Sequence, residues 1–342
     1  MPDTPPPSGG SLPASDQHSD KPQGAGQTAL AGKSRKRLLA WWETLPGNAR
    51  GAIWILIACF FFTIMTALIK YVGQRIHVSQ ILLVRQIVMT CIVAPTILRS
   101  FPSSLRTARP GLHLSRIFLA STAMMLGFTA VIHLPLADAT ALSFAKSFFV
   151  TIFAIIILKE TVGIHRWSAV LFGFIGVVIM LDPTGAGMQN AYGLMAVGGA
   201  ACAGMVMILI RQMSQTDRPV TILTYQACGV GLLMITPAWF YWVTPTWTEL
   251  ALMLAIGCIA WAAQMCNIQA FKAGEATAIA SLDYTRLLYA TLFGLVLFDT
   301  LPGVNTLIGA GIIIAASLYT VHREAQLNKR LVRAPEGRGY NH

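Results

Sequence analysis

Three ionisable residues lie in the middle of long apolar stretches. Lys146 lies within residues 138–158, and Asp283 and Arg286 lie within residues 276–298. A charge at the centre of a bilayer costs at least about 2.5–3.5 kcal/mol on insertion scales, so such residues usually face a cavity or a partner. Asp283 and Arg286 are spaced to share one helix face. The pattern predicts either a central cavity that binds the charged ends of a small substrate, or a buried ion-pair network that locks the chain together.

Four further polar or aromatic side chains are weaker candidates for the same cavity. Arg85 lies inside the apolar run 79–98 and could either attract an anionic substrate or pair with a helix C-terminus. Trp261 and Gln264 share a helix face and could stack on or hydrogen-bond to a heterocycle. The amide of Gln264 could equally bond to a neighbouring helix. Tyr225 is the fourth candidate.

The elements that must position these residues are apolar runs of bilayer length. The chain has 342 residues, of which 55% are hydrophobic and 11% are charged, whereas soluble domains carry about a quarter charged residues. We expect an all-α integral membrane protein with about ten spans of about 20 residues each. The predicted spans are 51–70, 79–98, 114–133, 138–158, 166–182, 191–211, 219–242, 248–270, 276–298 and 303–321.

The net charge of +11 follows a one-sided pattern. Lys and Arg are concentrated before the first span and in every second loop, and the loops at 134–137, 183–190, 243–248 and 299–302 contain neither. This is the positive-inside pattern of a multi-pass protein of the cell's inner membrane with both termini in the cytoplasm. The basic net charge therefore follows from the orientation of the protein in the lipid bilayer, and no nucleic-acid partner is needed to explain it.

The chain contains a repeated segment. Ala137–Asp138–Ala139–Thr140–Ala141 opens an apolar run that stops at Glu160–Thr161, and Gly274–Glu275–Ala276–Thr277–Ala278 opens one that stops at Asp299–Thr300. Five spans in each half is an odd number, so the two halves must cross the membrane in opposite directions, as inverted repeats. Aligning the starts places Lys146 opposite Asp283, and aligning the stops moves the match by two residues. Glu160 and Asp299 are expected to cap the following helix, with a coupling-proton role as the alternative.

These motifs resemble the EamA-type transporters of the drug/metabolite transporter superfamily. Members typically show an Ala-rich start, a helix often broken by Pro, a Gly-Glu stop and then a helix with spaced glycines. Here Ser147 stands where Pro is frequent, Lys159 and Phe298 replace the usual Gly, and Asp299 replaces the usual Glu. The resemblance implies a secondary transporter, with S-adenosylmethionine, riboflavin and amino acids as candidate substrates and either import or export as the direction.

The predicted organisation has four parts. Residues 1–48 form a disordered cytoplasmic tail with a basic membrane-proximal segment, 49–183 and 190–322 form the two repeats, and 323–342 form a basic cytoplasmic tail. We expect no catalytic residue, metal or cofactor, since P-loop, GxSxG and metal-ligand spacings are missing from the sequence. A membrane enzyme acting on lipid intermediates and a non-transporting scaffold are the alternatives. The sequence does not determine the oligomeric state, and a homodimer is compatible with it.

Overall fold

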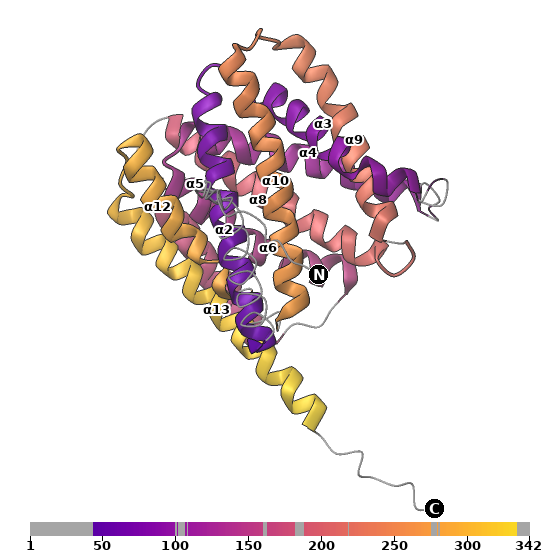
Figure 1. The fold of residues 1–342 in the computed structure, drawn as a ribbon. Coiled ribbons are helices and arrows are strands. Elements are labelled where there is room, and N and C mark those ends of the chain that lie inside the picture. The colour runs from indigo at the N-terminus through magenta and orange to yellow at the C-terminus, as the bar shows by residue number, and fades with distance from the viewer. Residues whose placement is uncertain are drawn as a thin grey trace, which may run out of the picture. The chain divides into compact units, whose positions relative to one another are not determined.

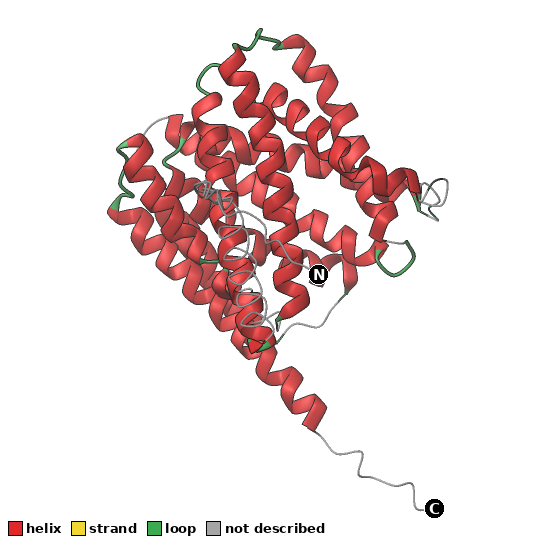
Figure 2. Ribbon diagram, in the orientation of Figure 1, coloured by secondary structure: helices red, strands yellow, loops and turns green. Residues whose placement is uncertain are grey.

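The structure of the protein is a computed structural model that describes residues 44–99, 101, 107, 109–159, 163–181, 188–217, 219–274, 279 and 281–333. Regular structure in these residues is helical, and no strand occurs among them (Figure 2). This confirms the all-α prediction. Residues 1–43 of the predicted tail and Glu160 lie outside the described residues. The described residues from Gly47 onward form one compact unit.

The helices follow the apolar runs, because a backbone inside a bilayer must satisfy its hydrogen bonds within its own segment. In the first half they are α2 (Gly47–Val72), α3 (Val78–Arg99), α4 (Pro110–His133), α5 (Leu136–Ser143), α6 (Lys146–Leu158) and α7 (Ile164–Leu181). In the second half they are α8 (Met188–Met213), α9 (Pro219–Phe240), α10 (Trp247–Ala273), α12 (Thr285–Phe298) and α13 (Val304–Arg333) (Figure 1). The last helix continues beyond its predicted end at residue 321.

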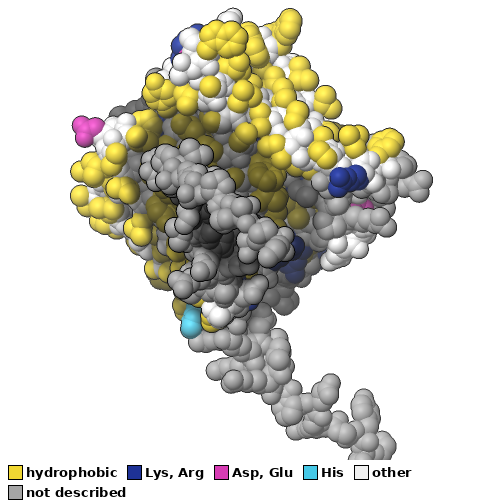
Figure 3. Space-filling view, in the orientation of Figure 1, with side chains coloured by type: hydrophobic (Ala, Val, Ile, Leu, Met, Phe, Trp, Pro, Cys, Tyr) yellow, Lys and Arg dark blue, Asp and Glu magenta, His cyan; other side chains and the backbone are white. Residues whose placement is uncertain are grey.

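The length and surface of these helices suit a bilayer. Within the described ranges, 6 helices are long and apolar enough to cross a membrane, and three shorter apolar helices accompany them. Large apolar side chains are exposed on many helices, including Trp239 (80%) and Trp247 (88%). In the space-filling view, yellow apolar side chains cover much of the visible surface, and charged side chains are few (Figure 3). So broad an apolar surface is incompatible with water and fits lipid.

The two halves interlock through matching pairs of helices. α2 packs against α10 and α4 against α8, which pairs the first helix of each half with the third helix of the other. α3 packs against α9, and α7 against α13, which pairs equivalent helices. α12 packs on α2, and α6 packs on α8 in the same relation. These contacts have the two-fold pseudosymmetry expected of a duplicated chain.

Polar contacts at the two ends of the bundle show that the halves are inverted. The ammonium of Lys70, near the end of α2, donates to the main-chain oxygen of Leu134 after α4 (2.6 Å). Arg75, after α2, pairs with Glu249 at the start of α10. We call this the outer end, following the charge pattern. At the opposite, inner end, His113 at the start of α4 binds Asp217 after α8. The equivalent helices α4 and α10 therefore begin at opposite ends.

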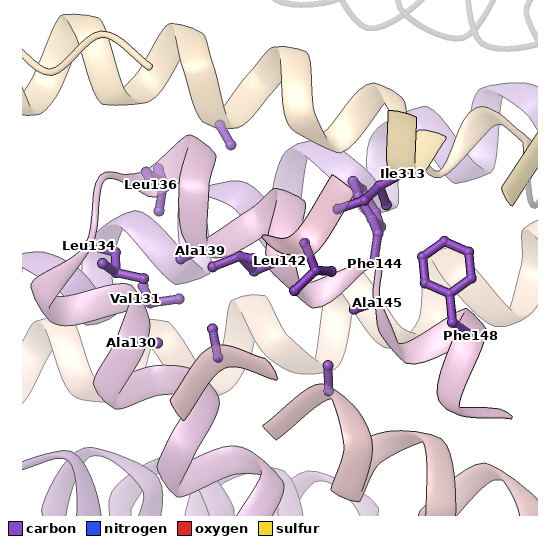
Figure 4. Packing of buried hydrophobic residues seen from close by; sticks show 14 of the residues in the cluster. Ala130, Val131, Leu134, Leu136, Ala139, Leu142, Phe144, Ala145, Phe148 and Ile313 are labelled. Carbon is purple, nitrogen blue, oxygen red and sulfur yellow. The ribbon is translucent and has the colours of Figure 1, made fainter. Parts of the chain in front are cut away.

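The fourth span of each half is interrupted, although both were predicted as continuous. Phe144 and Ala145 separate α5 from α6, and Asp283 and Tyr284 precede α12. In both places a backbone N–H donates to the oxygen three residues before it, instead of four as in an α-helix. Ser147 N–H donates to Phe144 O (3.1 Å), and Arg286 N–H donates to Asp283 O (3.1 Å). Such a tight turn breaks the helix without proline. Phe144 and Ala145 belong to a buried apolar cluster that also contains Phe148 and Ile313 (Figure 4).

The same spans end in the same unusual backbone conformation. Lys159 closes α6 with φ 54°, and Asp299 closes α12 with φ 50°. Glycine is the usual residue in this left-handed region. The residue that replaces Gly in the second half is therefore Asp299, one position after the predicted Phe298. This conformation also places Asp299 at the end of α12, whereas α13 begins only at Val304, so Asp299 ends one helix rather than capping the next.

Candidate substrate-binding site

The two interruptions bring the three predicted charges together. Lys146 is the first residue of α6, Asp283 lies in the second interruption, and Arg286 lies in the first turn of α12. Lys146 interacts electrostatically with both Asp283 and Arg286. Asp283 and Arg286 thus form one charged cluster with Lys146, which is more than a hundred positions away in the sequence.

Asp283 is held from α2. The thiol of Cys59 donates to Oδ1 of Asp283 (3.5 Å) and to its main-chain oxygen (3.7 Å). A thiol is a weak donor, so these contacts orient the carboxylate without neutralising it. The carboxylate keeps acceptor capacity for a stronger cationic or ammonium donor.

Arg286 lies against the end of α5. Its Nη2 donates to Oγ of Ser143, the last residue of α5 (3.0 Å), and its guanidinium lies 5.3 Å from the ring centre of Phe144. A cation is stabilised both near a helix C-terminus and over an aromatic face. Both contacts fix the guanidinium while leaving most of its five N–H donors for another group.

Aromatic and hydroxyl groups surround the charges. Phe144 and Tyr284, one from each interruption, meet edge to face with their ring centres 4.7 Å apart. The hydroxyl of Tyr284 bonds with Ser147 and Ser317, and the two serine oxygens lie 3.2 Å apart. Ser317 comes from α13, so the last helix also contributes to the site.

The Lys146 side chain is accessible although its surroundings are packed. Ala145 and Phe148 are 0% and 3% exposed, whereas the Lys146 side chain is exposed. Asp283 and Arg286 are half-buried. An accessible ammonium beside a half-buried carboxylate and guanidinium can receive a ligand without repacking of the helices.

Arg85 forms a separate, buried cationic position. Its side chain is on α3 and is 8% exposed, its Nη1 lies 3.9 Å from Sδ of Met124, and its Nε has no hydrogen-bond partner. A buried guanidinium without an anionic partner is destabilising, and an anion that reached it would be bound strongly. The described contacts do not join Arg85 to Lys146.

The other predicted residues lie elsewhere. Trp261 and Gln264 are on α10, half-buried and exposed respectively, and no contact in the described part of the chain joins them to the three charges. Tyr225 packs against His113 at the inner end, with ring centres 4.4 Å apart.

Sequence reasoning missed several residues of the site. Cys59, Ser143, Phe144, Tyr284 and Ser317 all contact the charges or their neighbours. Proximity in the sequence could have indicated three of them, because Ser143, Phe144 and Tyr284 each lie within three residues of a predicted charge. Cys59 and Ser317 reach the site from distant helices, and nothing in their local sequence indicates it.

The fold and this site define a class of protein: a multi-pass membrane transporter built from two inverted helical repeats. The chain belongs to the EamA-like transporter family, because that family's model matches it twice, over residues 49–182 and 191–321. The two matches cover well over half of the chain and correspond to its two halves.

Similar proteins include transporters of different cargoes. An "S-adenosylmethionine uptake transporter" of Rickettsia prowazekii is 29% identical over 285 residues, covering 82% of this chain and 96% of the relative. A "Riboflavin transporter" of Vibrio cholerae is 28% identical, with 82% and 96% covered. The "Pseudopaline exporter CntI" of Pseudomonas aeruginosa is 25% identical, with 78% and 94% covered. A solved crystal structure with 16% sequence identity and a TM-score of 0.56 covers 84% of this chain and 99% of its own, and shows a shared fold.

Proposed function

We propose that the protein is a secondary transporter that moves a small zwitterionic or anionic metabolite across the inner membrane by alternating access, with both termini in the cytoplasm. The observation that carries the proposal is the meeting of Lys146, Asp283 and Arg286 at two helix interruptions. Interrupted helices near the middle of a span are where secondary transporters of inverted-repeat architecture bind substrate.

The charges of the cluster favour a substrate that carries both signs. Lys146 and Arg286 suit a carboxylate, and the free acceptor capacity of Asp283 suits an ammonium or sulfonium group. Phe144 and Tyr284 offer aromatic surface for a ring. Among the candidates, S-adenosylmethionine combines all of these groups. Amino acids use only the charged part, and the uncharged ring system of riboflavin uses only the aromatic part.

Arg85 adds a second cationic position to this proposal. It lies on another helix, and its guanidinium has no anionic partner among the described residues. We assign it the role of attracting an anionic group of the substrate before that group reaches the central cluster.

Uptake into proteoliposomes tests the proposal. The purified protein should accumulate labelled S-adenosylmethionine, with amino acids and riboflavin measured in parallel. Lys146→Met and Asp283→Asn each remove a charge-assisted hydrogen bond of about 1.5–3 kcal/mol. We therefore expect the substrate concentration for half-maximal uptake to rise about ten- to hundred-fold.

A matched control separates site effects from loss of charge in general. Lys272 is exposed in the last turn of α10, away from the cluster, so Lys272→Met should transport normally. Normal uptake by Lys146→Met and Asp283→Asn would refute the assignment of the site. Uptake of riboflavin but not of S-adenosylmethionine or amino acids would refute the preference for a zwitterion.

A further inference from the structure

A buried polar contact joins the two halves at the inner end. Nε2 of His113, in the first turn of α4, lies 2.7 Å from Oδ2 of Asp217, which follows α8. The hydroxyl of Thr107 donates to the same carboxylate oxygen (2.6 Å). The side chains of His113 and Asp217 are only 1% and 2% exposed. We call this contact the inner latch.

The inner latch continues along α4 and α9. Nη1 of Arg116, one turn after His113, donates to the main-chain oxygen of Ile222 (2.9 Å), and its Nη2 donates to Oε1 of Gln226. The ring of Tyr225 packs on His113. α4 belongs to the first half and α9 to the second, so separating the halves at this end would break every one of these bonds.

A second polar contact joins the halves at the outer end. Arg75, after α2, pairs with Glu249 in the first turn of α10 and donates through Nη2 to the main-chain oxygen of Thr244 (2.9 Å). Beside it, the amide of Gln80 exchanges two bonds with the backbone of Val243, at 2.9 and 3.1 Å. The side chains of Arg75 and Glu249 are 47% and 16% exposed. We call this contact the outer latch.

The two latches are related by the pseudosymmetry of the fold. The outer latch joins the segment after the first helix of the first half, α2, to the start of the third helix of the second half, α10. The inner latch joins the segment after the first helix of the second half, α8, to the start of the third helix of the first half, α4. Exchanging the halves turns one latch into the other, although the residue types differ.

We propose that the inner and outer latches are the two gates of the transporter, and that the end at which a latch breaks is the end that opens. This inference rests on transport by alternating access, as proposed above. The latches also differ in burial: the side chains of His113 and Asp217 are 1% and 2% exposed, whereas those of Arg75 and Glu249 are 47% and 16% exposed. Opening the inner end therefore requires water to reach groups that are fully buried, whereas the outer latch is already in contact with solvent.

Distances between spin labels in the reconstituted full-length protein test this inference without any substrate. The native cysteines are first replaced; they are Cys59, Cys91, Cys202, Cys228, Cys258 and Cys266. New cysteines then carry labels at exposed positions on both sides of each latch. Ser115 and Gln215 report on the inner end, and Tyr71 and Thr248 report on the outer end.

The variants Asp217→Ala and Glu249→Ala each remove one latch. We expect Asp217→Ala to lengthen the inner distance and Glu249→Ala to lengthen the outer distance, each without lengthening the other. Asp299→Asn removes an acidic charge outside both latches and should change neither distance. If Asp217→Ala does not fold, Thr107→Val removes a bond to the same carboxylate and should lengthen the inner distance.

Two results would overturn the inference: distances that do not respond to loss of either latch, or inner and outer distances that lengthen together. The labels report conformation alone. If the distances respond to loss of a latch but the protein transports none of the tested metabolites, the proposed substrate class is contradicted and the assignment of the gates is not. Normal uptake combined with unresponsive distances would contradict the gates alone.

Discussion

Replacing Gly309 by alanine should loosen the contact between the last helices of the two halves. Gly309 lies on α13 where it crosses α7. A Cβ added at Gly309 would lie 2.5 Å from the main-chain oxygen of Gly176 on α7 and 2.3 Å from Cγ of Met180. The thioether side chain of Met180 can move, but the backbone oxygen of Gly176 can move only with its helix.

The size of the effect follows from this geometry. A carbon approaches a carbonyl oxygen to about 3.3 Å, so α7 and α13 must separate by nearly 1 Å at this point, and neighbouring contacts are lost. Overpacking of this kind destabilises by about 1–3 kcal/mol. Alanine also favours the helical backbone over glycine by about 1 kcal/mol. The net effect of Gly309→Ala should be a destabilisation of up to about 2 kcal/mol.

Gly311 provides a matched control two residues further along the same helix. A Cβ at Gly311 meets nothing within 4 Å, so Gly311→Ala gains the helical preference without a clash. Thermal unfolding in detergent should therefore give a lower midpoint for Gly309→Ala than for Gly311→Ala, which should match or exceed the parent. Because the helical preference is common to both variants, their difference measures the clash. Equal midpoints would refute the close approach of α7 and α13.

Three further predictions concern residues at helix ends. Lys159→Gly should raise the unfolding midpoint, since a non-glycine residue in the left-handed region costs about 1 kcal/mol. Asp299→Gly should raise the midpoint less, because Asp tolerates this conformation better than Lys. A lower midpoint for both variants would contradict the positive φ angles. Lys70→Met should destabilise by about 2 kcal/mol or more, as judged from thermal unfolding, because it removes the donor to the main-chain oxygens of Val131 and Leu134, whereas the oxygen of Ile132 keeps its bond from Gln74. Burial lowers the pKa of His77, so folding favours its neutral form, and stability should fall as the pH drops below about 6.5. His77→Phe keeps a ring against Tyr241 and should show a smaller loss in a pH series of unfolding curves; an equal loss would place the titrating group elsewhere.

The fold was predictable because its strongest signals are local. Apolar runs, alternating basic loops and a repeated segment each lie within short stretches of sequence, and they indicated an all-α membrane protein with two halves. The central charges were predictable for the same reason, since Lys146, Asp283 and Arg286 interrupt otherwise apolar helices. A charge at this depth in a membrane demands a partner or a cavity, and the structure brings the three charges to one place.

Features that depend on distant partners were not predictable. His113 is 104 residues from Asp217, and Arg75 is 174 residues from Glu249. As single residues near span ends, these side chains look like ordinary flanking charges. The helix interruptions were also hidden, because they arise from three-residue hydrogen bonds at Phe144 and Asp283 and not from proline. The contact of Tyr225 with His113 at the inner end was hidden because it also depends on a distant partner.

The hydrogen bonds at the interruptions also resolve how the two halves correspond. Ser147 N–H bonds to Phe144 O as Arg286 N–H bonds to Asp283 O. Ser147 therefore corresponds to Arg286 and Phe144 to Asp283, so that Lys146 corresponds to Thr285. Each charged residue in one half therefore corresponds to an uncharged residue in the other half.

This asymmetry has a physical reason. Two lysines or two aspartates at equivalent positions would repel each other across the two-fold axis in a medium of low dielectric constant. Placing Lys146 on one half and Asp283 with Arg286 on the other puts a carboxylate next to the two cations, which offsets their mutual repulsion, and gives the cluster a direction. A substrate with a carboxylate at one point and a cationic group at another can then bind in a single orientation, while the symmetric scaffold around it remains free to open at either end.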